Sequence, residues 1–326
     1  MFPIERPRRL RRTRALRDLV AETTLSPGDL VAPLFVAEGR DAPQPISSLP
    51  GQLQHTLGSL HDEVRSLHAA GVAGVILFGI PLVKDEVGSG AWDSNGIVQV
   101  ALRSLRDEFG DELVVMADLC LDEYTSHGHC GIVRSDGSVD NDATLDLYAR
   151  TAIAQARAGA QVIGPSGMMD GQVGAIRRAL DDEGFTDTII MAYTAKYASA
   201  LYGPFREAVD VEIAHGGDRR GYQQDSRNRR EALREAVLDV NEGADIVMVK
   251  PAMTYLDIVS DLRRELDVPL CAYHVSGEYA MIKAAGANGW IDEKAVALEQ
   301  LIAVRRAGAD FVLTYFARDI AEELGS

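Results

Sequence analysis

The 326-residue sequence has only three cysteines, and it lacks an apolar run long enough to cross a bilayer. Its start also lacks the apolar segment and small-residue cleavage site of a secretory signal. We therefore expect a cytoplasmic protein whose cysteines are thiols or ligands rather than disulfides. Positive charge is scarce, with 33 basic against 49 acidic side chains. The formal net charge of -16 argues against binding to nucleic acid or to an anionic membrane.

The first 17 residues depart from this acidic balance. They contain seven arginines and one glutamate, which leaves 26 basic and 48 acidic side chains elsewhere, a net charge of -22. A basic arm on an acidic body favours docking onto a neighbouring subunit, and a nucleic-acid-binding tail is the alternative. We assign residues 1–28 to this arm and residues 29–326 to one catalytic domain, because no linker divides the rest.

A recurring phrase indicates the fold. Four segments combine a helix end, a glycine that fits the left-handed position after a helix, and a short apolar run, at 68–79, 156–166, 240–251 and 305–316. Four further strand candidates lie at 30–36, 112–120, 188–194 and 268–277. Amphipathic stretches at 59–71, 96–110, 146–159, 228–243 and 293–308 predict helices between them.

Eight alternating units predict the α/β class, as a (β/α)8 TIM barrel preceded by the N-terminal arm. A doubly wound open sheet is the structural alternative, but no GxGxxG follows the first strand to favour it. Catalytic groups of a TIM barrel gather at the carboxyl ends of the strands. The polar residues at these ends are Asp118, Cys120, Ser166, Lys196, Lys250, Ser276 and Tyr315.

Lys196 and Lys250 carry most of the chemical information, because each ends an apolar run. A single lysine there is more often one that extends from the barrel rim into solvent. Two amines that share apolar walls lose their protons more easily, since desolvation and like-charge repulsion both disfavour the ammonium form. A neutral amine can attack a ketone, so the pair predicts Schiff-base chemistry.

The segment after Lys196 runs about thirty residues before the next predicted helix, where such loops usually have only a few. It contains Arg206 and Arg219, whose guanidinium groups suit a carboxylate in a fork geometry. We interpret the segment as an active-site lid. A surface loop with solvated arginines is the alternative.

A second group of polar residues follows Asp118, in the phrase DLCLDEYTSHGHCG. Its Cys120, Asp122 and Cys130 offer two thiolates and a carboxylate, a set that suits zinc and leaves a position open for water or substrate. The spacing is not that of a zinc finger. Two cysteines of a reducing compartment can also be bystanders.

At this point the sequence resembles one family over nearly all of its length, the porphobilinogen synthases or 5-aminolevulinate dehydratases. The matching phrases include GPSGMMDGQVGAIR, MAYTAKYASALYGPFR, GDRRGYQ, NRREALREA, MVKPAMTYLDIV, YHVSGEYAMIKAA and RAGADFVLTYFA, besides the cysteine-containing loop. The resemblance implies a TIM barrel whose arm embraces a partner subunit in a homo-octamer. It also implies condensation of two 5-aminolevulinate molecules, with loss of two waters, to porphobilinogen in tetrapyrrole and haem biosynthesis.

The resemblance assigns roles to the residues at the strand ends. It implies that Lys250 forms a Schiff base with the first substrate, on the propionyl side, and Lys196 with the second, on the acetyl side. Asp118 and Ser166 are its candidates for proton transfer and orientation.

Two pairs of residues are implied as carboxylate clamps. Ser276 and Tyr315 are expected to hold the first carboxylate, while Arg206 and Arg219 hold the second.

The metal that the resemblance implies is less certain to be zinc, because members of the family differ in the ligands of this loop. Zinc-dependent members that resemble the animal enzyme have three cysteines in the loop, whereas this chain has Cys120, Asp122 and Cys130. Two thiolates still favour zinc, but one oxygen ligand weakens the selectivity against magnesium. Glu235 matches a glutamate that contributes in bacterial relatives to an allosteric magnesium site at a subunit boundary. On sequence alone it is an exposed helix carboxylate.

Two rival functions remain open from the residues. One is a different Schiff-base lyase or aldolase, which would need one active lysine and usually a phosphate-binding loop, for which HVSGEYA is a candidate. The other is a non-enzymatic assembly protein that oligomerises through its arginine-rich arm.

Overall fold

The structure is a computed structural model that describes residues 3–213 and 217–325. Within these residues, eight parallel strands close into a barrel, because the first strand pairs with both the second and the last. Around the barrel they are β1 (Leu30–Ala37), β4 (Gly74–Ile80), β5 (Val114–Leu119), β6 (Val162–Pro165), β7 (Ile189–Lys196), β8 (Ile246–Lys250), β9 (Leu270–His274) and β10 (Phe311–Thr314). All eight predicted strands and the (β/α)8 barrel are confirmed.

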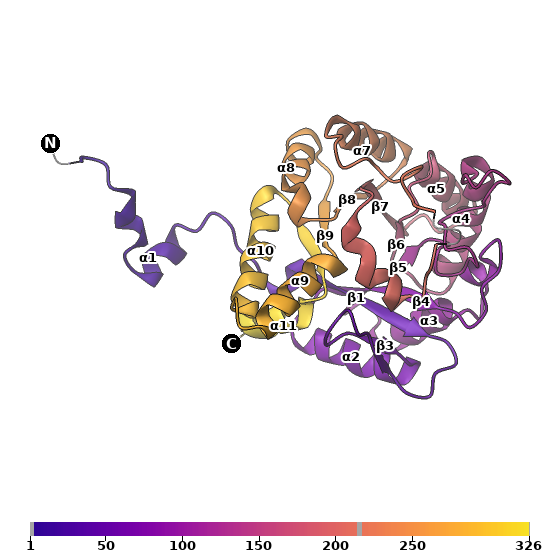
Figure 1. Cartoon of the computed structure of the whole chain (residues 1–326), viewed down its shortest axis with the longest axis horizontal. Coiled ribbons are helices and arrows are strands. Elements are labelled where there is room, and N and C mark those ends of the chain that lie inside the picture. The colour runs from indigo at the N-terminus through magenta and orange to yellow at the C-terminus, as the bar shows by residue number, and fades with distance from the viewer. Residues whose placement is uncertain (1–2, 214–216, 326) are drawn as a thin grey trace.

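Two short strands, β2 (Gln44–Pro45) and β3 (Leu53–His55), extend the sheet beside β1. Helices surround the barrel (Figure 1). Five of them overlap the predicted amphipathic stretches: α2 (Leu57–Ala69), α3 (Ile97–Phe109), α4 (Asn141–Arg157), α7 (Arg230–Glu242) and α10 (Glu293–Ala307). Of these, α2 begins two residues and α4 five residues before the predicted start. Other helices in the ring are α5 (Gln172–Asp182), α8 (Leu256–Glu265), α9 (Ser276–Ala287) and α11 (Ala317–Gly325). Short 3-10 turns, η3 (Ser89–Trp92) and η6 (Met253–Tyr255), lie in the loops.

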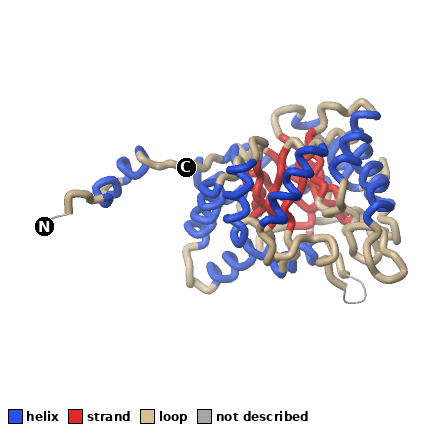
Figure 2. The backbone as a smooth tube through the Cα atoms, turned by 90° about the horizontal axis from the view of Figure 1, so that it is seen from above, coloured by secondary structure: helices blue, strands red, loops and turns tan. Residues whose placement is uncertain are grey.

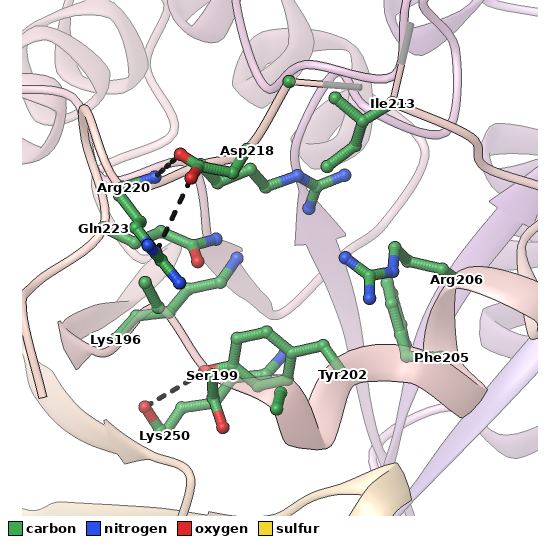
Figure 3. A pocket seen from close by; sticks show the side chains of 14 residues that line it. Lys196, Ser199, Tyr202, Phe205, Arg206, Ile213, Asp218, Arg220, Gln223 and Lys250 are labelled. Carbon is green, nitrogen blue, oxygen red and sulfur yellow. Dashed lines mark hydrogen bonds and ion pairs between the residues drawn. The ribbon is translucent and has the colours of Figure 1, made fainter. Parts of the chain in front are cut away.

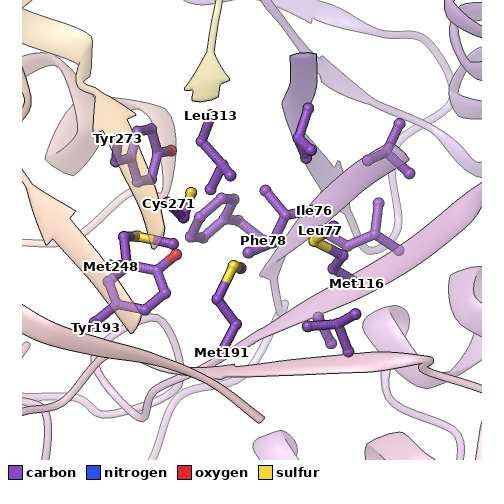
Figure 4. Packing of buried hydrophobic residues seen from close by; sticks show 14 of the residues in the cluster. Ile76, Leu77, Phe78, Met116, Met191, Tyr193, Met248, Cys271, Tyr273 and Leu313 are labelled. Carbon is purple, nitrogen blue, oxygen red and sulfur yellow. The ribbon is translucent and has the colours of Figure 1, made fainter. Parts of the chain in front are cut away.

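The barrel strands are buried almost throughout, because their inner face fills the barrel and their outer face is covered by helices. Figure 4 shows side chains from different strands meeting in the core, among them Met116, Met191, Met248 and Leu313. The unbranched methionines fill the irregular space between the strands. The packed interior keeps the strand ends in fixed relative positions.

The glycines of the recurring phrase behave as predicted. Gly71, Gly159, Gly243 and Gly308 all follow a helix and have φ between 83° and 124°. A side chain there would be strained, so these glycines allow each helix to stop and the chain to turn into the next strand.

The N-terminal arm lies apart from the barrel (Figures 1 and 2). It contains η1 (Pro7–Arg11) and α1 (Arg14–Leu19), neither of which has a buried residue. The turn η2 (Pro27–Asp29) then leads into β1. Neither of these two elements therefore buries a hydrophobic side chain against the barrel, whereas Leu25, closer to β1, is partly buried and packs against the core. None of the helices in the described part of the chain has the length and apolar character needed to span a membrane.

The long segment after β7 is confirmed as a loop with little regular structure. It contains η4 (Ala200–Tyr202) and α6 (Gly203–Ala208), and its residues 214–216 lie outside the described ranges. Tyr197 and Gln224 form a parallel bridge, which ties the beginning of the loop to its end. Described residues of this segment, among them Tyr202 and Arg206, line a cavity together with Lys196 at the carboxyl end of β7.

Candidate active site

The two lysines meet at the mouth of the barrel. Lys196 ends β7, Lys250 ends β8, and the two are register partners across the neighbouring strands. Their side chains are only 5% and 4% exposed, respectively. Both line one cavity of about 250 Å³, into which Lys196 and Arg206 reach from opposite sides (Figure 3). The predicted convergence of the two amines is therefore present in the structure.

Aromatic rings form much of the wall around the amines. The Lys250 Nζ lies 4.3 Å from the ring centre of Tyr273, 5.0 Å from that of Tyr193 and 5.2 Å from that of Phe205. The Lys196 Nζ lies 5.6 Å from the Tyr193 ring centre. Burial, and next the neighbouring Lys196 charge, lower the pKa of Lys250 to about 7. This lowered pKa favours the neutral amine, which is the form that nucleophilic attack requires.

Asp118 and Ser166 are linked to Lys196 in one hydrogen-bonded chain. The Ser166 hydroxyl donates to Asp118 Oδ2 at 2.9 Å, and the Lys196 Nζ donates to the Ser166 carbonyl at 2.5 Å. Burial raises the pKa of Asp118 to about 6, although the Lys250 and Lys196 charges oppose the increase. A carboxyl group with this pKa can both accept and donate a proton near neutral pH.

The two arginines of the loop have different surroundings. Arg206, on α6, has no hydrogen-bond or ion-pair partner for its guanidinium group within the described ranges, and it lines the cavity. Arg219 also lines the cavity, but its Nη2 lies 2.7 Å from Asp122 Oδ2 and donates to the Gly128 carbonyl at 2.9 Å. Arg219 thus connects the lysine cavity to the cysteine-containing loop.

Ser276 and Tyr315 lie behind the cavity wall near Lys250 rather than in the lining itself. The Ser276 hydroxyl accepts from the Phe205 amide at 3.1 Å and donates to the Leu201 carbonyl at 3.3 Å. The Tyr315 hydroxyl is 3.1 Å from that of Tyr273, whose ring contacts the Lys250 amine. Both residues therefore lie on the Lys250 side of the cavity.

The predicted metal ligands come together as well. Ligand atoms of Cys120, Asp122 and Cys130 all lie within 4.8 Å of one another, and all three residues are buried. Burial raises the pKa of Cys120, whereas the Cys120 thiol, against the effect of burial, holds the pKa of Cys130 below its ordinary value. Although burial would raise the pKa of Asp122, the Arg219 charge keeps it below the ordinary range. A carboxylate and two thiols at this spacing could hold a metal ion, with Arg219 bound to one Asp122 oxygen.

Glu235 lies on α7, in a different cavity of about 440 Å³ whose lining includes Asp170 and Glu231. The residue pattern alone predicted an exposed carboxylate at this position. In the structure, the Glu235 side chain is partly buried. Burial, and then the Asp170 and Glu231 charges, raise its pKa. These three residues line a cavity that neither Lys196 nor Lys250 lines.

Several residues of the lysine cavity escaped the sequence reasoning. Tyr202 and Phe205 contribute rings to its wall, and Gln223 contributes a buried amide whose Nε2 has no partner among the described residues. Gln223 belongs to the GDRRGYQ phrase. The only signal that could have identified it was its position four residues after Arg219 in the loop.

Fold and site together define an α/β-barrel protein with a buried lysine pair in one cavity, an arrangement typical of enzymes that act on carbonyl compounds. The family model described as delta-aminolevulinic acid dehydratase matches residues 4–323. The delta-aminolevulinic acid dehydratase of Mycobacterium tuberculosis is 58% identical over 322 residues, covering 98% of this chain and 97% of the relative. That of Streptomyces coelicolor is 56% identical, covering 99% and 98%.

A solved structure of a protein from the same family also matches this chain. The Toxoplasma gondii delta-aminolevulinic acid dehydratase, or porphobilinogen synthase, in complex with the reaction product porphobilinogen matches with a TM-score of 0.97 and 45% identity, over 99% of this chain and 92% of that one. The chain belongs to the delta-aminolevulinic acid dehydratase family. The predicted family and its porphobilinogen synthase activity are thereby confirmed, against the aldolase and assembly-protein alternatives.

Proposed function

We propose that this chain acts as a hydro-lyase that condenses two 5-aminolevulinate molecules, with loss of two waters, through Schiff bases at Lys250 and Lys196. The observation that carries the proposal is the burial of both amines, as register partners, in one cavity. The porphobilinogen in the Toxoplasma gondii structure supports the same product here.

The neutral Lys250 amine attacks the ketone of the first substrate, and loss of water leaves an iminium ion. Lys196 does the same with the second substrate after it transfers a proton. The Asp118–Ser166 pair beside Lys196 is suited to orient the amine and to accept or return protons. An iminium ion acidifies the neighbouring carbon, so formation of the carbon–carbon and carbon–nitrogen bonds becomes feasible near neutral pH.

Each substrate also carries a carboxylate that must be held. Arg206 is suited to the second carboxylate because its guanidinium group faces the cavity and lacks a protein partner within the described ranges. Arg219 joins it while retaining the Asp122 contact through another nitrogen. Ser276 and Tyr315 hold the first carboxylate, which requires their hydroxyl groups to exchange their present partners for the ligand.

Cys120, Asp122 and Cys130 would hold the metal, and zinc is the ion that two thiolates favour over magnesium. A bound zinc ion would supply Lewis-acid chemistry next to the second substrate's amine. The protein's own contribution is to keep Asp122 ionised through Arg219 and to exclude water from the three buried ligands.

Assembly and allostery complete the proposal. Residues 1–28 form the arm that embraces a partner subunit in a cytoplasmic homo-octamer, which is supported by the arm's separation from its own barrel. Glu235, with Asp170 and Glu231 nearby, is the proposed allosteric magnesium site. Magnesium keeps most of its waters, so a few carboxylates around a wide cavity suffice.

Borohydride reduction tests the central proposal. Incubation with 5-aminolevulinate and borohydride should attach substrate to Lys250, and porphobilinogen should form when reductant is omitted. The variant Lys250→Met should form no adduct at that position and should lose turnover. A folded Lys250→Met protein that keeps substantial activity would contradict the assigned role.

A further inference from the structure

One buried carboxylate outside the reaction chemistry connects two loops of the site. Glu278, on α9, is 2% exposed. Its Oε1 accepts from the Met253 amide and its Oε2 from the Val275 amide, both at 2.7 Å. No lysine, arginine or histidine in the described ranges forms an ion pair with it. Its charge is therefore held by backbone N–H groups alone.

The two amides belong to the segments that carry Lys250 and Ser276. Met253 starts η6, three residues after Lys250, and Val275 directly precedes Ser276 at the start of α9. Register pairing between β8 and β9 ends at Val249, one residue before Lys250. Beyond that point, the Glu278 carboxylate joins η6, in the loop after β8, to the beginning of α9.

An ordinary capping glutamate would bond only the start of its own helix. The Val275 contact fits that role. The other carboxylate oxygen, however, accepts a hydrogen bond from Met253, in the loop that follows β8. Burial raises the pKa of Glu278 to about 7, against the effect of the backbone hydrogen bonds. Such a placement is unfavourable for a carboxylate unless its hydrogen bonds compensate for desolvation.

The start of α9 is also fixed against the lid. A Cβ at Gly277 would lie 2.5 Å from the Leu201 carbonyl oxygen, so only glycine allows this approach. Ser276 bonds the Phe205 amide and the Leu201 carbonyl from the same turn. Displacement of this turn would therefore move the lid contacts together with the Lys250 loop.

We propose that Glu278 is a positioning residue for Lys250: its carboxylate holds η6, which follows Lys250, against the start of α9, so that the amine and Ser276 keep the spacing that the first substrate needs. The inference rests on the proposed function, because it assumes that Lys250 forms the Schiff base. The Lys196 amine is held instead by its bond to the Ser166 carbonyl, just after β6.

The test uses the full chain and the probe 4-oxopentanoate, a keto acid that resembles the substrate without its amine. Borohydride traps the adducts, and peptide mass spectrometry measures labelling at Lys250 and Lys196 in the same sample. Glu278→Gln keeps the size of the side chain but turns one acceptor into a donor that faces an N–H group. Glu299→Gln, at an exposed position of α10, is the matched control.

We expect Glu278→Gln to slow labelling at Lys250 by about 10- to 100-fold, because a shift of about 1 Å in a reacting group has effects of this size. Labelling at Lys196 should fall clearly less than labelling at Lys250, since the Lys196 amine donates to the Ser166 carbonyl and the Glu278 carboxylate bonds the segments next to Lys250 and Ser276. Unchanged Lys250 labelling in the folded variant, or an equal loss at both lysines, would overturn the inference. No adduct at Lys250 in the wild-type chain would instead overturn the proposed function, and the inference with it.

A second measurement does not depend on the variant being folded. Hydrogen exchange of the wild-type chain should show slow exchange of the Met253 and Val275 amides, because both are bonded to the buried carboxylate. Exchange of either amide as fast as that of exposed loops would show that the link does not exist in solution.

Discussion

Because the two lysines are paired, the pKa of Lys250 should depend on the charge of Lys196. Burial and the Lys196 charge together lower its pKa to about 7. The substitution Lys196→Met keeps the length of the side chain but removes the charge. Since like-charge repulsion favours loss of a proton, we expect the pKa of Lys250 to rise in this variant.

The size of the effect follows from the distances. The two Nζ atoms lie 5.6 Å and 5.0 Å from the same Tyr193 ring centre, so their separation cannot exceed the sum of these distances. With an effective dielectric constant of about 20, two charges about 6 Å apart repel by roughly 3 kcal/mol, and the limiting separation gives about half of this. These energies correspond to an increase of about 1 to 2 pH units. The pKa should remain below 10.5, because burial is the larger cause of its depression.

The assay is the rate at which borohydride traps 4-oxopentanoate on Lys250 as a function of pH. Below the pKa the amine is an unreactive ammonium ion, so the rate rises through a midpoint that reports its titration. The midpoint should move upward in Lys196→Met and should stay in place in Lys294→Met, whose side chain is 59% exposed on α10. If the pH midpoint of Lys196→Met is unchanged or lower than that of the wild-type chain, the like-charge argument is refuted.

Four further outcomes follow from the site. Arg206→Met should raise the KM about 10- to 100-fold and leave the melting temperature unchanged, because no protein partner is lost within the described ranges; a large fall in melting temperature would contradict this. Arg219→Met should raise the KM and, in addition, lower the free energy of unfolding by about 3 to 5 kcal/mol in chemical denaturation, because Asp122 would lose its ion pair while it remains buried. An unchanged free energy of unfolding would count against the ion pair. Thiol-directed chelation should reduce turnover at least tenfold with unchanged circular dichroism, and zinc rather than magnesium should restore it. In Glu235→Gln, magnesium should no longer shift sedimentation toward the larger assembly; a wild-type response would remove this residue from the proposed site.

The barrel and its lysine pair could be predicted because they follow from local patterns. Short apolar runs that follow glycine-terminated helices predict parallel strands, and the carboxyl ends of such strands lie at one mouth. Lys196 and Lys250 therefore had to face the same end of the barrel once the strands were correct. The glycines at the helix ends confirm the same local rule, since each has positive φ.

Contacts between distant loops could not be predicted in the same way. The Arg219–Asp122 ion pair joins residues nearly a hundred positions apart, and the Glu278 link depends on where β8 and β9 stop pairing. Neither leaves a periodic trace in the sequence, because each depends on how separate loops pack. Gln223, whose Nε2 has no partner among the described residues, is a third case, visible only once the cavity wall exists.

The Arg219–Asp122 contact changes how the two predicted constellations relate to each other. The sequence divides them into a carboxylate clamp and a metal site, but the structure places one residue of each within 2.7 Å. A guanidinium group has several N–H donors and a carboxylate has two oxygens, so each can serve its own ligand while they remain paired. Because Arg219 also lines the lysine cavity, a shift of Asp122 would displace a group that we assign to the second substrate. Substitutions of the metal ligands should therefore alter the KM as well as the metal content, and a KM that stays constant across such variants would separate the two sites again.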